Sequence, residues 1–161
     1  MAIKVGDRLP SATFMTMTAE GPKPQSTDDI FKGKKVVLFA VPGAFTPTCD
    51  KNHLPGFVTN ADKIKGKGID TIAVTGVNDV FVMDAWKQNT GAAGKIEFLA
   101  DGSGKFAKEI GLSVDLGERG LGTRSQRYAM VVDDGVVKTL NIEDAPGKAD
   151  ISGAENLLKG L

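Results

Sequence analysis

The chain has 161 residues, and its 20 Lys and Arg residues balance its 20 Asp and Glu residues, so the formal net charge at pH 7 is zero. This length suits a single domain, residues 1–161, with a core of its own. The charge balance argues against nucleic acid or an anionic membrane surface as a partner. Because the chain shows no signal-peptide pattern, no membrane-length apolar run and only one cysteine, we expect a cytoplasmic protein without structural disulfides.

Strands and helices are expected to alternate along most of the chain. Apolar runs bounded by turn residues predict strands at residues 13–16, 35–41, 69–76, 96–99, 128–132 and 136–142. Helical spacing of apolar residues predicts helices at 49–64, 80–88 and 105–110, and a last helix after residue 152. This order indicates an α/β fold whose central sheet has mixed strand directions.

Two local signals mark the C-terminal elements. Asp134-Gly135, between two β-branched runs, predicts a tight hairpin that pairs the last two strands. Ser152, followed by Glu155 and then by Leu157-Leu158, predicts a capping box that opens the last helix.

Cys49, the only cysteine, falls in the turn between a strand and a helix. Residues 42–49 read Pro-Gly-Ala-Phe-Thr-Pro-Thr-Cys and follow the apolar run 36–41. We expect Cys49 in the first turn of the helix, where unpaired N–H groups and the positive end of the helix dipole favour a thiolate. An inert, packed cysteine is the alternative, and the surrounding motif favours a nucleophile.

This segment resembles the active site of the type II, or type V, peroxiredoxins. The resemblance rests on residues 42–49, on His-Leu-Pro-Gly-Phe at 53–57, and on four later blocks at 76–86, 100–104, 124–128 and 141–143. It extends over essentially the whole chain. It implies a thioredoxin-like fold with a mixed central sheet flanked by helices, and a peroxidase whose cysteine becomes a sulfenic acid.

The resemblance implies a catalytic set of Cys49, Thr46, Arg127 and Pro42. Thr46 precedes the cysteine by three residues, and its hydroxyl both donates and accepts hydrogen bonds, as a group that bridges sulfur and peroxide should. Its alternative role is an N-cap, since Pro47 suits the first helical position. Pro42 has no N–H and by resemblance shields the thiolate; from the sequence alone it ends a strand.

Two arginines compete for the place of a cation beside the sulfur. The family's arginine directly precedes the aromatic residue that opens the strand, which selects Arg127 before Tyr128 over Arg124. His53 lies four residues after Cys49 and would share its helix face. We expect it to act as a packing and polar neighbour, and the alternative is a Cys–His ion pair that tunes the thiol. One histidine and one cysteine fall short of a metal site, and no cofactor is implied.

The chain departs from many relatives in having no second, resolving cysteine. Ile151 and Val74 stand where the resemblance places one, so we expect an external thiol reductant: glutathione, a glutaredoxin or a thioredoxin. Phe45, Phe81 and Trp86 are expected in the core, with one or more at the contact of a homodimer, as the resemblance implies.

The leading functional hypothesis is therefore a one-cysteine thiol peroxidase acting on hydrogen peroxide and organic hydroperoxides. The alternative is a peroxide sensor or redox-regulated binding protein that signals through Cys49 oxidation without turnover. Sustained consumption of peroxide in the presence of added thiols distinguishes the two.

Overall fold

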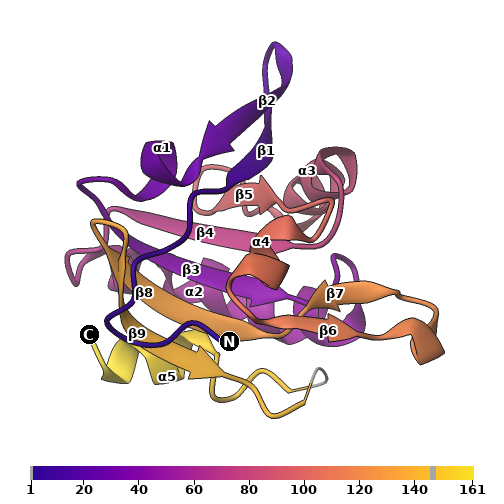
Figure 1. Ribbon diagram of the computed structural model, residues 1–161. Helices are drawn as coiled ribbons and strands as arrows, with labels where there is room; N and C mark the ends of the chain where they lie inside the picture. The colour runs from indigo at the N-terminus through magenta and orange to yellow at the C-terminus, as the bar shows by residue number, and fades with distance from the viewer. Residues whose placement is uncertain (1, 146–147) are drawn as a thin grey trace.

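A mixed seven-stranded sheet runs through the middle of the molecule (Figure 1). The computed structural model describes residues 2–145 and 148–161. The strand order is β2-β1-β5-β4-β3-β8-β9. The strands of this sheet are β1 (Thr13–Thr18), β2 (Gly21–Ser26), β3 (Lys35–Val41), β4 (Thr71–Gly76), β5 (Glu97–Ala100), β8 (Tyr128–Asp133) and β9 (Val136–Ile142). The central strands β3, β4 and β5 are parallel, whereas β8 pairs antiparallel with β3.

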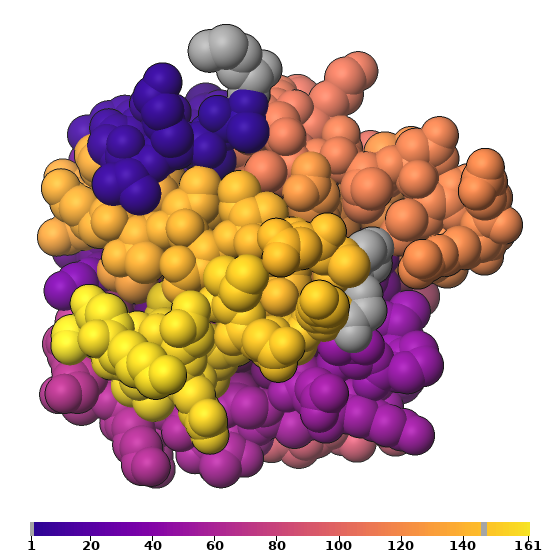
Figure 2. All heavy atoms as spheres, turned by 90° about the horizontal axis from the view of Figure 1, so that it is seen from below, coloured from indigo at the N-terminus to yellow at the C-terminus, as the bar shows by residue number. Residues whose placement is uncertain are grey.

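A short second sheet pairs β6 (Ser113–Asp115) with β7 (Thr123–Ser125), and this ribbon protrudes at one side of the molecule (Figures 1 and 2). The helices are α1 (Thr27–Phe31), α2 (Leu54–Lys65), α3 (Val80–Thr90), α4 (Lys105–Glu109) and α5 (Ala154–Lys159), with a π-helical turn at Cys49–His53 and a 3-10 turn at Gly117–Arg119. None of the described helices combines the length and apolarity needed to cross a bilayer.

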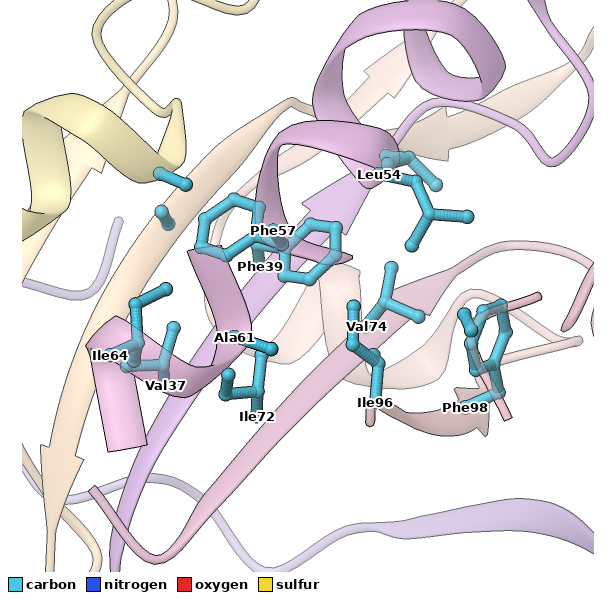
Figure 3. Packing of buried hydrophobic residues seen from close by; sticks show 14 of the residues in the cluster. Val37, Phe39, Leu54, Phe57, Ala61, Ile64, Ile72, Val74, Ile96 and Phe98 are labelled. Carbon is cyan, nitrogen blue, oxygen red and sulfur yellow. The ribbon is translucent and has the colours of Figure 1, made fainter. Parts of the chain in front are cut away.

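The core has two halves, one on each face of the sheet. Residues 37, 39 and 41 of β3 pack with α2, α3 and α5, and residues 36, 38 and 40 pack with α1 and α4. Burial on both faces explains why β3 is an unbroken apolar run. On the α2 side, Phe39 stacks on Phe57 with ring centroids 4.0 Å apart (Figure 3).

The predicted mixed sheet flanked by helices is confirmed, and four short elements were not expected: β2, α1, β6 and β7. β2 contains Pro22 and Pro24, which argue against a strand. They are tolerated because β2 is an edge strand that pairs only with β1. β6 and β7 have three residues each, too few to show a period.

The predicted capping box at Ser152 is wrong. Gly153 is the N-cap of α5 and makes no side-chain cap, whereas the Ser152 hydroxyl donates to Glu143 Oε2 at 2.7 Å. A charged acceptor in the tertiary structure outcompetes the local helix end for this hydroxyl. The sequence motif therefore located the helix but misassigned its serine.

Candidate active site

The turn that carries Cys49 begins where β3 ends. Phe45 takes a left-handed backbone conformation, with φ of 64°, and the amide of Ala44 donates to Asn78 Oδ1 at 2.9 Å. The helix then opens at residue 47, and Cys49–His53 forms a π-helical turn. The predicted helical turn is present but wider than an α-turn, a form often found at functional sites.

The Cys49 sulfur is fully buried and receives a hydrogen bond from an arginine. Nη2 of Arg127 lies 2.9 Å from Sγ. Arg127 reaches it because β8 lies beside β3 with Tyr128 opposite Ala40, which brings Arg127 level with the end of β3, where the cysteine turn begins. A guanidinium is always cationic, so Arg127 brings a positive charge and N–H donors to the sulfur.

The side chain of Arg124, the competing arginine, donates hydrogen bonds to main-chain carbonyls. Its Nη1 donates to the Pro42 carbonyl at 3.2 Å, and its Nε donates to the Leu121 carbonyl at 2.8 Å. A Cβ added to Gly43 would come within 2.9 Å of Arg124 Nη1, so a larger residue there would displace the guanidinium. The two arginines therefore differ in what they contact. Arg127 contacts the sulfur, whereas Arg124 contacts the main chain at Pro42.

The Thr46 hydroxyl donates to the Gly43 carbonyl at 2.7 Å, rather than accepting from a helix N–H as a cap would. Its backbone carbonyl accepts from the amide of Asp50 at 2.8 Å, which ties it to the cysteine turn. Since the hydroxyl proton is used on Gly43, the oxygen retains acceptor capacity only. A peroxide O–H is a suitable donor for it.

His53 is buried and contacts Arg127, not the sulfur. Nδ1 lies 3.0 Å from Arg127 Nη1, and Nε2 lies 3.0 Å from the Ser152 carbonyl oxygen. Because a guanidinium only donates, Nδ1 accepts the hydrogen bond from Arg127. Nε2 therefore carries the ring proton and donates to the Ser152 carbonyl. Burial and the Arg127 cation lower the pKa of His53 to about 3, against the raising effect of the Ser152 carbonyl, so the ring is neutral at pH 7.

The aromatic residues near the turn divide between core and surface. Trp86 is fully buried, as predicted, and its Nε1 donates to Asp50 Oδ1 at 2.9 Å. Phe45 and Phe81 were expected in the core, but they are 44% and 64% exposed in the single chain. Phe45 lies against Trp86 with ring centroids 6.4 Å apart. The surface beside the cysteine turn is thus partly apolar.

The two positions at which the resemblance places a resolving cysteine differ in exposure. Val74 is fully buried in the core beneath α2 (Figure 3), and Ile151 is 40% exposed in the segment before α5. Within the described residues, no group of three or more His, Cys, Asp or Glu side chains is arranged to hold a metal ion.

Comparison with known proteins identifies the family. The Redoxin family model matches residues 4–158. Peroxiredoxin-2C of Oryza sativa subsp. japonica is 47% identical over 160 residues, which cover 99% of this chain and 98% of the relative. The chain is a type II peroxiredoxin. The reduced Prx3 of Vibrio vulnificus, crystallised in complex with hydrogen peroxide, is 51% identical with a TM-score of 0.93, and the match covers 98% of each chain.

The family resemblance and the thioredoxin-like fold expected from the sequence are thereby confirmed, and the relatives support a peroxidase of the oxidoreductase class. Another peroxiredoxin relative, chloroplastic Peroxiredoxin-2E of Arabidopsis thaliana, is 46% identical over 99% of this chain and 70% of its own length. Because relatives occupy organelles, the expected cytoplasmic location stays a prediction.

Proposed function

We propose that this peroxiredoxin reduces hydrogen peroxide and small organic hydroperoxides with Cys49 as the nucleophile and an external thiol as the reductant. The observation that carries the proposal is the 2.9 Å contact between Arg127 Nη2 and Cys49 Sγ in a buried turn. A buried cation beside a thiol supplies both an ionised sulfur and a donor for the charge that leaves it.

In the first step, the thiolate attacks the nearer peroxide oxygen in line with the O–O bond. The S–O bond forms as the O–O bond breaks, so Cys49 is oxidised to a sulfenic acid and the peroxide is reduced. The leaving oxygen takes up a proton and departs as water or an alcohol. Thr46 accepts from the peroxide hydroxyl and aligns it, and Arg127 stabilises the negative charge as it passes from sulfur to the leaving oxygen.

Pro42 contributes by shape. It follows the last residue of β3, it has no N–H, and its carbonyl accepts a hydrogen bond from Arg124. In this position Pro42 shields Cys49 and keeps water and bulky oxidants away from the sulfenic acid.

In the second step, an external thiol attacks the sulfenic acid, which releases water and leaves a mixed disulfide on Cys49. A second thiol then attacks that disulfide, forms a disulfide with the first and restores Cys49. Glutathione, a glutaredoxin or a thioredoxin fits this role, because neither Val74 nor Ile151 offers a resolving thiol. We also propose a homodimer that covers the apolar surface around Phe45 and Phe81, and action in the cytoplasm.

One observation favours the sensor alternative: Cys49 is fully buried, so an external thiol reaches it only after the turn opens. Steady-state peroxide consumption with each thiol donor decides between the two. Many equivalents consumed by the wild type, and none by Cys49→Ser, support the enzyme. Consumption of one equivalent, with no further consumption in the presence of any donor, supports the sensor.

A further inference from the structure

Glu143 is a buried acidic residue that the mechanism above does not use. It belongs to the Asn-Ile-Glu block at 141–143, follows the last residue of β9 and is only 6% exposed. Its Oε2 accepts two hydrogen bonds of 2.7 Å, one from the amide and one from the hydroxyl of Ser152. Among the described residues, no group donates to its other oxygen, Oε1. A buried carboxylate with only one oxygen hydrogen-bonded is costly, and the contacts of Glu143 indicate what offsets that cost.

The hydrogen bonds of Glu143 form a closed ring that begins and ends at Arg127. The Glu143 amide donates to the Arg127 carbonyl at 2.9 Å, and the Glu143 side chain holds Ser152. The Ser152 carbonyl accepts from His53 Nε2 at 3.0 Å, and His53 Nδ1 accepts from Arg127 Nη1 at 3.0 Å. One residue thus fixes both ends of Arg127: its main chain directly, and its guanidinium through Ser152 and His53.

We propose that Glu143 is a positioning residue: by fixing the Ser152 carbonyl it sets the tautomer and orientation of His53, and so directs Arg127 Nη2 to Cys49. This inference rests on the proposed function of Arg127 at the sulfur. Ser152 lies between β9 and α5, and the C-terminal segment packs against the segment that contains α2 (Figure 2). The ring therefore joins the C-terminal segment to the nucleophile.

A shift of the Ser152 carbonyl would change first the tautomer of His53 and then its contact with Arg127. If the Ser152 carbonyl moves away, the buried Nε2–H loses its acceptor, and the proton is better placed on Nδ1 or the ring rotates. An Nδ1–H would then face the guanidinium, which has only donors, so the Arg127 contact would be lost. A residue that merely tied the loop to the sheet would leave the His53 proton and the Cys49 reactivity unchanged.

The chain offers a direct readout, because His53 is its only histidine. In a nitrogen-15 NMR spectrum of the imidazole at pH 7, we expect the wild type to show one neutral form with the proton on Nε2. In Glu143→Ala we expect that signal to shift toward the other tautomer or to a mixture. Alkylation of Cys49 at the same pH should slow by about tenfold, since a misplaced catalytic group commonly costs that much or more.

Graded variants guard against a folding defect. Ser152→Ala removes one of the two bonds to Oε2 and keeps the amide, and Glu143→Gln keeps an acceptor oxygen, so both should give smaller changes in the same direction. Glu155→Gln, which removes an exposed carboxylate at the start of α5, is the matched control and should behave as wild type. Should Glu143→Ala fail to fold, the two milder variants decide.

Folded variants with an unchanged His53 tautomer and unchanged alkylation would overturn the proposal. These readouts do not depend on peroxidase turnover. A wild type that turns over no peroxide, yet responds to Glu143→Ala in both measurements, would refute the proposed function and leave the positioning role standing.

Discussion

Replacing Arg127 with glutamine removes the only cation that the described structure places on the Cys49 sulfur. At 2.9 Å and an effective dielectric constant of about 20, the attraction between unit charges is about 6 kcal/mol, which sets an upper limit on the loss. The amide of glutamine still donates a neutral hydrogen bond, and the difference between charged and neutral bonds, about 1 kcal/mol, sets a lower limit. Removal of a comparable donor from an oxyanion site costs about 3 kcal/mol, so we expect a loss of roughly 100-fold.

The assay is the second-order rate of peroxide reduction by the pre-reduced protein, measured by stopped flow before any thiol donor acts. Arg124→Gln is the matched control, because it removes the same charge from the neighbouring position that contacts the Pro42 carbonyl at 3.2 Å. We expect it to slow the reaction less than tenfold. Equal and small effects of the two substitutions, or a larger effect at Arg124, would refute the assignment of Arg127.

The neutral, buried His53 makes the free energy of unfolding depend on pH, because its pKa is about 3 in the folded chain and about 6.5 in the unfolded chain. Between these values the unfolded state binds the extra proton. The free energy of unfolding therefore falls by up to about 1.4 kcal/mol per pH unit as the pH drops from 6.5 to 3. Denaturant unfolding against pH should show a shallower acid limb for His53→Gln than for wild type; identical limbs would contradict the shift. After one equivalent of peroxide, intact-protein mass spectrometry should find a glutathione adduct on Cys49 when glutathione is present, and over-oxidised sulfur when excess peroxide acts without it. A disulfide-linked dimer as the main product in both samples would contradict the external-donor scheme. Sedimentation at micromolar concentration should give a dimer mass for wild type and a smaller mass for Phe81→Asp; a monomeric wild type would count against the homodimer.

The sequence predicted the parts of the fold that depend on local pattern. β3 matches its predicted bounds because both of its faces are buried, and the Asp134-Gly135 turn gives the expected hairpin because both residues have positive φ. The four elements that were not predicted, β2, α1, β6 and β7, have three to six residues each and carry no clear hydrophobic period. β2 forms despite its prolines only because it pairs on one side.

The site was predictable only as far as the Cys49 turn and the choice of arginine. The ring through Glu143 depends on a register shift between Val131 and Val132, which no local pattern reveals. The turn pairs Val132 with Val137, and the same register continued would put Ile142 opposite Arg127. The bulge instead pairs Ile142 with Tyr128, so that Glu143 bonds to Arg127. The Ser152 motif misled because the partner of its hydroxyl, Glu143, follows β9 and lies outside the helix that the motif opens.

The central claim is that Cys49 itself reduces peroxide, and a single-turnover experiment tests it most directly. Pre-reduced protein is mixed with one equivalent of hydrogen peroxide, and a sulfenic-acid trap is added before mass spectrometry. We predict that one equivalent of peroxide disappears and that the trap labels Cys49 in nearly every molecule, with neither result in Cys49→Ser. Peroxide that persists beside unmodified Cys49, or that disappears equally fast with Cys49→Ser, would contradict the account.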